Sequence, residues 1–156
     1  MAIRTIEGTT EKLITGEELL KMGDIGRSEL IEGRLVMKSP TGGPHGSIEG
    51  NFDEALRAFV RPRKLGQVKV GEVGIYTRRD PDTVRGADVL FISTERAAKI
   101  KSRGFLEIAP DLIVEVMSPD DRWSEVLQKL REYFEIGYGW SGSPIPIREQ
   151  STLIAR

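Results

Sequence analysis

The sequence contains no cysteine and a single histidine, His45, among its 156 residues. The absence of cysteine excludes a disulfide framework and any metal site built from thiolates. It fits a reducing compartment, and we expect a cytoplasmic protein. No apolar run approaches the roughly 18 residues that a membrane-spanning helix needs. The N-terminal residues also lack the apolar segment of a signal peptide, so we expect no membrane contact.

Neither sign of charge dominates, because 23 basic residues face 24 acidic ones and the net charge is −1. This balance argues against a basic protein that coats nucleic acid. Two local clusters of basic side chains remain, and each has two interpretations: a contact with phosphate groups or an ordinary solvated surface. The clusters are Arg57, Arg61, Arg63 and Lys64, and Lys99, Lys101 and Arg103.

The length suits one domain, and the apolar periodicity predicts an α/β fold with a mixed central sheet flanked by helices. Thr15 and Glu18 have the spacing of a capping box at the start of a helix. The predicted elements are a helix over 15–22, a hairpin over 28–38, an amphipathic helix over 45–60, a strand over 67–76, a polar turn over 78–85, a strand over 87–92, a short helix over 94–101, a strand over 112–117 and a helix over 122–136.

Two acidic residues interrupt the two most apolar predicted strands. Asp88 lies near the start of the segment ADVLFI, and Glu115 lies inside LIVEVM. Such runs are typical of central strands buried on both faces. A buried carboxylate is costly to desolvate unless a cation lies beside it. That cation is either the Lys or Arg of an internal ion pair or a bound metal ion.

The presence of two such acids on neighbouring strands favours the metal. Mg²⁺ prefers oxygen ligands and is usually bound by one or two carboxylates. Asp88 and Glu115 can supply these, the carbonyl of Val116 a third oxygen, and Mn²⁺ is a second candidate ion. Lys129, on the following helix, can assist an attacking water. Hydrolysis of a phosphodiester bond uses this combination of a metal and a nearby cation.

These motifs resemble the Uma2 family of restriction-endonuclease-like proteins. The resemblance spans roughly residues 15–137 and rests on ELIEGRLV (29–36), the Ser-Pro and His45 that follow, APDLIVEVMSPDDR (109–122), Lys129 and Tyr133. It implies a PD-(D/E)xK nuclease core whose catalytic lysine has moved from the strand to the helix, since Met117 stands at the usual lysine position. Ala87 replaces the usual proline before Asp88, a mild departure.

Four further residues have a functional and a structural interpretation. His45 can contact phosphate, transfer a proton or hold a carboxylate, or it can make a structural hydrogen bond at a helix start. Glu32 can approach the metal, but a hairpin turn position is the favoured interpretation. Ser39 and Ser118 lack the partners of a nucleophilic serine, so we interpret them as a loop and a cap residue.

Three functions are compatible with these residues. A metal-dependent DNA endonuclease is favoured, because Asp88, Glu115 and Lys129 occur together. A nuclease-fold protein without activity, acting as a binding or assembly module, is the alternative. A hydrolase of small phosphate esters is a weaker third. DNA is the expected partner, and a homo-oligomer is compatible with the sequence.

The C-terminal segment departs from the family pattern. We expect a single domain over 1–137 and a divergent tail over 138–156, because YGWSGSPIPIREQSTLIAR is rich in turn formers and has no strand pattern. The family has a strand of the type Gly-Val-x-x-x-Trp here, then Asp-Pro. One choice of codons for residues 137–152, read out of frame, encodes VRLVWIADP. A single-base deletion near the Gly137 codon would therefore explain the tail, which would then pack poorly.

Resequencing the gene tests this frameshift hypothesis. We expect codons that, in the shifted frame, encode a segment of the type VRLVWIADP, because that segment restores the missing strand and turn. The codons of residues 137–152 are the measurement. Codons incompatible with this shifted segment would leave a genuinely divergent tail as the explanation.

Overall fold

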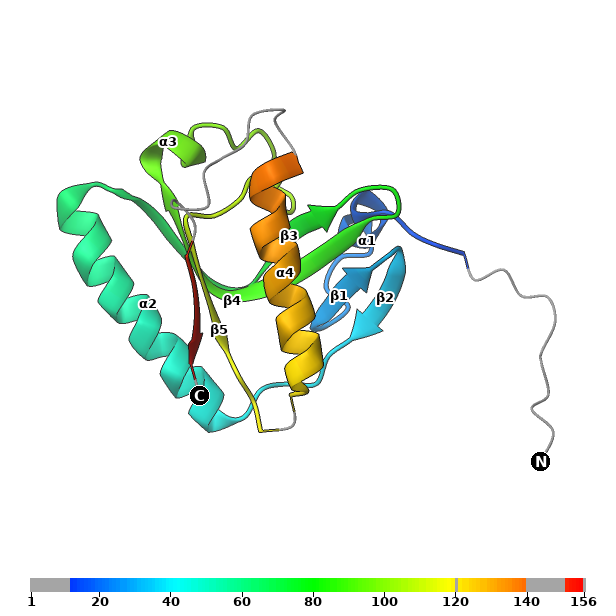
Figure 1. Ribbon diagram of the computed structural model, residues 1–156, viewed down its shortest axis with the longest axis horizontal. Helices are drawn as coiled ribbons and strands as arrows, with labels where there is room; N and C mark the ends of the chain where they lie inside the picture. The colour runs from blue at the N-terminus through cyan, green and yellow to red at the C-terminus, as the bar shows by residue number, and fades with distance from the viewer. Residues whose placement is uncertain (1–11, 120, 140–150, 156) are drawn as a thin grey trace.

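The computed structural model describes residues 12–119, 121–139 and 151–155 (Figure 1). The described strands form one sheet in the order β2-β1-β4-β5-β6, and β3 also pairs with β4. All pairs are antiparallel except β5 with β6, so the sheet is mixed, as predicted. The elements are α1 (Gly16–Lys21), β1 (Ser28–Ile31), β2 (Arg34–Met37), α2 (Gly43–Arg63), β3 (Gly66–Arg78), β4 (Thr83–Ser93), α3 (Thr94–Ala97), β5 (Leu112–Val116), α4 (Trp123–Gly139) and β6 (Ser151–Ala155).

The two long helices cover opposite faces of the sheet (Figure 1). On one face, Val60 of α2 packs with Val89 and Val114 from the two central strands. On the other face, Tyr133 and Ile136 of α4 pack in a cluster that contains Leu90, Ile92 and Ile113. The central strands are therefore buried on both sides, which explains their nearly continuous apolar sequences.

The local signals near the N-terminus are confirmed. Glu18 N–H donates to Thr15 Oγ1 at 3.1 Å and Thr15 N–H donates to Glu18 Oε2 at 2.8 Å, which completes the capping box of α1. The β1–β2 hairpin turns at Glu32 and Gly33, whose φ angles of 49° and 77° are both left-handed. This is the backbone that a two-residue hairpin loop requires.

The polar turn predicted over 78–85 is wrong for its second half, because β4 already begins at Thr83. The sequence pattern missed this part of the strand because Arg85 is charged. Its guanidinium is buried and bonds to Glu29 and Glu132, so a charged residue occupies a core position. The helix predicted over 94–101 is also shorter, since α3 ends at Ala97. Helix α4 begins at Trp123, so Ser118 lies before it and is not its cap.

The tail contains a strand that the sequence pattern did not predict. The backbone of β6 pairs in parallel with β5, from Leu112 with Ser151 to Val116 with Ala155. The expectation of a tail without strands is therefore wrong for 151–155. A central strand with a free edge offers hydrogen-bonding groups to any extended segment that reaches it. Most of the segment involved in the frameshift hypothesis, 140–150, lies outside the described residues.

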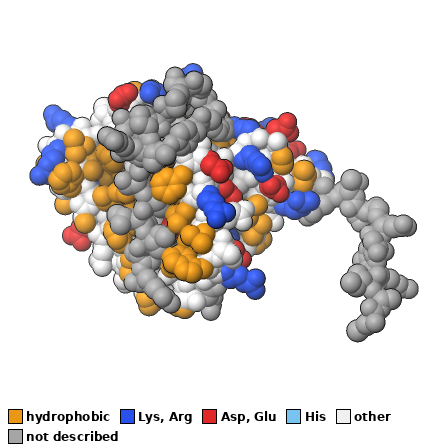
Figure 2. All heavy atoms as spheres, in the orientation of Figure 1, with side chains coloured by type: hydrophobic (Ala, Val, Ile, Leu, Met, Phe, Trp, Pro, Cys, Tyr) orange, Lys and Arg blue, Asp and Glu red, His pale blue; other side chains and the backbone are white. Residues whose placement is uncertain are grey.

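Helix α4 is apolar on its outer side as well. Trp123, Leu127 and Phe134 are among the exposed large hydrophobic residues, and Figure 2 shows hydrophobic side chains gathered on this face of the molecule. Within the described residues, none of the helices combines the length and the apolar character needed to cross a membrane.

The hairpin offers a matched pair for a stability measurement. Leu30 is fully buried, whereas its cross-strand partner Leu35 is 39% exposed. We expect Leu30→Ala to lower the free energy of unfolding by about 2–5 kcal/mol, because it removes a packed side chain and leaves a cavity. Leu35→Ala should cost less than about 1 kcal/mol. Urea unfolding followed by circular dichroism measures both, and equal losses would contradict this placement of the core.

Candidate active site

Asp88 and Glu115 lie side by side on the central strands β4 and β5. Both are buried, with 3% and 7% of their surface exposed. Val116 N–H donates to Asp88 Oδ2 at 2.6 Å, so the Asp88 carboxylate lies against the backbone of β5 directly after Glu115. The structure thus brings together the two acids that the sequence singled out, and Val116 with them.

Helix α4 brings Lys129 and Tyr133 to the same place. Lys129 Nζ donates to Glu115 Oε2 at 2.8 Å and to the carbonyl of Gly86 at 2.6 Å. Tyr133 Oη donates to the other oxygen of Glu115, also at 2.8 Å. Lys129 and Tyr133 are four residues apart and therefore share a face of the helix. Both oxygens of Glu115 are held, which fixes the orientation of its carboxylate.

Glu29 is a third buried acid here, and the sequence analysis did not select it. It accepts from Gly86 N–H at 3.0 Å and from Arg85 at 3.1 Å, and it lies 3.3 Å from Lys129 Nζ. The sequence offered one indication of its burial, namely its position beside Leu30 in a short predicted strand. Without the fold, nothing showed that β1 pairs with β4 at this point.

Three other candidates lie outside this cluster. Glu32 is exposed at the hairpin turn and pairs with Arg78 at 2.6 Å, as its structural interpretation predicted. The Ser39 carbonyl accepts from Arg27, and Ser118 N–H donates to Asp121 Oδ2 at 2.7 Å. These contacts are those of loop residues.

His45 approaches Asp88 from α2. Its Nε2 lies 3.6 Å from Asp88 Oδ2, and its Nδ1 lies 3.8 Å from Glu49 Oε2. The nearest ligand atoms of these three residues all lie within 4.8 Å of one another, close enough to share a metal ion. His45 Nδ1 is buried and has no hydrogen-bond partner among the described residues. Glu49 was missed, although its spacing of four from His45 on a helix was a usable signal.

Glu72 is a further acid that the sequence analysis missed. It lies in an irregular part of β3, between the paired segments that end at Val70 and resume at Val73, and has a left-handed φ of 56°. Such bulges often re-aim a side chain beside an active site. Glu72 pairs with Arg27. Burial, with Asp88 as the next cause, raises the pKa of Glu72 above its ordinary value.

Burial and charge set the protonation of the central pair. Burial raises the pKa of Glu115 to about 7, and the nearby charge of Asp88 adds to this, while Lys129 opposes it. Burial alone would lower the pKa of Lys129, but Glu115 and Glu29 outweigh it and hold that pKa well above its ordinary value. Lys129 is therefore a permanent cation at neutral pH, whereas Glu115 titrates in the physiological range.

The side chains around Asp88 fit a divalent cation. Carboxylates outnumber cationic side chains here, and Arg85 is already shared with Glu132. A buried excess of negative charge is costly, and a metal ion would neutralise it. The Asp88 carboxylate accepts from the Val116 N–H of β5, and it forms a candidate metal-binding group with His45 and Glu49 of α2.

Comparisons with known proteins point to one family. A family model, Uma2, described as "Putative restriction endonuclease", matches residues 17–140. A solved structure of a "putative nuclease belonging to DUF820" from Anabaena variabilis is 25% identical, with a TM-score of 0.64. The similarity covers 78% of this chain and 68% of that chain. None of the curated proteins matches the chain.

The raised pKa of Glu115 predicts how stability depends on pH without added metal. The folded-state pKa of Glu115, about 7, exceeds the ordinary 4.5. The contribution of Glu115 to the free energy of unfolding is therefore complete below pH 4.5 and is lost as the pH rises through 7. Over this range we expect the wild type to lose roughly 3 kcal/mol relative to Glu115→Gln. Urea unfolding of both chains with a chelator at several pH values measures this difference. A difference that does not change with pH would show that Glu115 keeps an ordinary pKa.

Proposed function

Because the chain belongs to the Uma2 family, we propose that it is a metal-dependent DNA endonuclease that hydrolyses phosphodiester bonds. The observation that carries the proposal is the arrangement of Asp88, Glu115 and Lys129, which three different elements bring to one buried point. The description of the family and that of the solved relative both name a nuclease, which supports the same class of reaction.

We assign the metal to Asp88, Glu115 and the carbonyl of Val116, with Mg²⁺ as the ion and Mn²⁺ as its substitute. These are oxygen donors, which Mg²⁺ prefers, whereas an imidazole such as that of His45 suits softer ions. When bound, the metal would polarise the phosphate and lower the pKa of an attacking water. In this assignment, His45 helps to hold the Asp88 carboxylate, since its Nε2 lies 3.6 Å from Asp88 Oδ2.

Lys129 acts in the proposal as a cation and not as a base. Its pKa lies well above the ordinary value, so it stays protonated at neutral pH. An ammonium group at this place would orient the attacking water and stabilise the negative charge that develops on the phosphate. Tyr133 holds the far oxygen of Glu115 and so keeps that carboxylate in position.

DNA is the proposed substrate, and the surface charge supports contacts with its backbone. In the first basic cluster, Arg57 pairs with Asp53 and Arg63 lies over the ring of Phe59. Arg61 and Lys64 belong to the same cluster on α2 and at its end, and such residues would contact phosphates. A cytoplasmic location and a homo-oligomer remain part of the proposal.

Cleavage of plasmid and single-stranded DNA with Mg²⁺ or Mn²⁺ tests the function. We expect Asp88→Asn and Lys129→Ala each to lower the cleavage rate by at least about 100-fold while the fold is kept, because each removes a charge needed in the transition state. A chelator should abolish cleavage by the wild type. Gel assays of the rate, with circular dichroism as the check on folding, are the measurements.

Matched variants sharpen this result. Lys12→Ala removes an exposed lysine that lies outside the site and outside both basic clusters, and it should cleave at the wild-type rate. Glu115→Gln should lose more activity than Glu49→Gln if the oxygen donors hold the metal, and the reverse order would assign the metal to the His45 side. DNA binding without cleavage under all metal conditions would favour the inactive binding module.

A further inference from the structure

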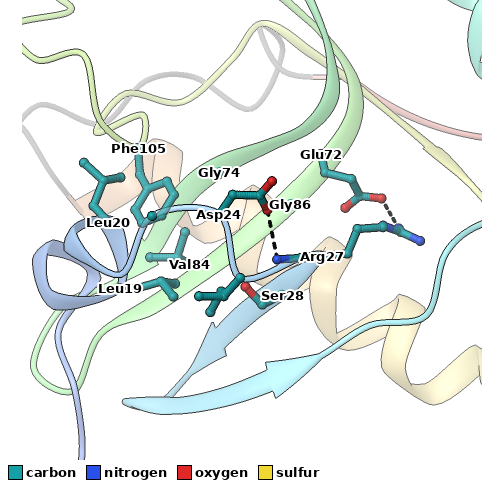
Figure 3. Close-up of a pocket in the computed structure, with 13 residues that line it drawn as sticks. Leu19, Leu20, Asp24, Arg27, Ser28, Glu72, Gly74, Val84, Gly86 and Phe105 are labelled. Carbon is teal, nitrogen blue, oxygen red and sulfur yellow. Dashed lines mark hydrogen bonds and ion pairs between the residues drawn. The ribbon is translucent and has the colours of Figure 1, made fainter.

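A cavity of about 530 Å³ opens beside the proposed catalytic cluster. It lies between α1, the start of β1 and the adjoining parts of β3 and β4, and Glu72 and Gly86 are among its lining residues (Figure 3). The carbonyl of Gly86 is the group that accepts from Lys129, and Gly86 precedes Asp88 on the same strand by two residues. The cavity and the cluster therefore share a backbone segment.

One end of the cavity is apolar and includes an aromatic ring. Figure 3 shows Phe105, Leu19, Leu20 and Val84 gathered there. Gly74 makes this possible, because a Cβ atom at that position would come within 2.3 Å of the Phe105 ring. The ring can lie against β3 only because the strand has a glycine at this point.

The other end is polar but does not suit an anion. Asp24 and Glu72 lie there, and Arg27 is already bonded to Glu72 and to the carbonyl of Ser39. The acids offset the single arginine, so a phosphate would gain little. Asp24 accepts from Gly26 N–H through Oδ1, which leaves Oδ2 as an acceptor for a neutral ligand.

Building on the proposed nuclease function, we propose that this cavity receives one unstacked nucleobase of the nucleic acid substrate, next to the phosphate held at the catalytic cluster. The volume lies within the range of small-molecule pockets. A nucleobase is flat and largely uncharged, and it carries hydrogen-bonding groups on its edge. It would stack on Phe105 and present that edge to Asp24 at the polar end. Enzymes that act on extruded or single-stranded nucleotides hold the base in this manner.

Binding of short single-stranded DNA, with and without one abasic site, tests this assignment. The measurement is fluorescence anisotropy in the presence of a chelator, so that no cleavage occurs. We expect the intact strand to bind about tenfold more tightly than the abasic strand, as the loss of one stacked base predicts. Phe105→Ala should reduce this ratio nearly to one. Leu20→Trp should do the same by filling the cavity, and Leu20 is already 48% exposed, so the fold should tolerate the change.

Trp123→Ala is the matched control, because it removes an exposed aromatic ring from α4, outside the cavity and the basic clusters, and should leave the ratio unchanged. Equal binding of the two strands by the wild type would overturn the proposal, as would a ratio that survives both cavity variants. The outcome of the cleavage assay is independent of the outcome of this binding assay. Cleavage without base preference would leave the nuclease and remove the base pocket, whereas base preference without cleavage would do the opposite.

Discussion

The burial of several carboxylates around one lysine is the constraint on which the rest of the site depends. Glu29, Asp88 and Glu115 are each nearly inaccessible to solvent. An isolated buried carboxylate would cost several kcal/mol, so each one needs a partner. The partners come from different elements: Lys129 and Tyr133 from α4, Arg85 from β4, and backbone amides from β4 and β5. Helix, hairpin and sheet are thereby tied to one polar centre.

Strand β4 organises both the polar centre and the cavity beside it. Within a few residues it supplies the carbonyl of Gly86 to Lys129, the amide of Gly86 to Glu29 and the carboxylate of Asp88 to the backbone of β5. Gly86 also has Glu72 directly above it, since a Cβ atom at this position would lie 2.6 Å from Glu72 Oε2. A larger residue at this position would displace Glu72 and the lining of the cavity together.

The protonation states follow from the same burial. A low-dielectric environment disfavours the ionised form of a carboxylate, and a neighbouring acid strengthens this effect. Glu115 experiences both, whereas in Glu29 three cations and a backbone amide outweigh burial, and its pKa is lowered. Two acids that both contact Lys129 are therefore shifted in opposite directions. Such divergence is common where groups are arranged for proton transfer or for metal binding.

Sequence patterns predicted the features that depend on neighbouring residues along the chain. The capping box at Thr15, the hairpin turn at Gly33 and the apolar face of α2 are local, and each is present in the structure. The interest of Asp88 and Glu115 also came from local context, because an acid inside an apolar strand requires a partner. The strand residues before Asp88 were missed, since Arg85 is polar and its burial depends on distant acids.

The sequence by itself therefore determined the fold class, the family and the two central acids, because periodicity and motif spacing are properties of the chain. Only the tertiary structure decided that Glu29, Glu49 and Glu72 join these acids and that Glu32 does not. The position of each of these residues depends on how strands pair, on how a helix packs against the sheet, or on a bulge in a strand. Such contacts link residues far apart in the sequence, and a one-residue change in register would turn a side chain to the other face of the sheet.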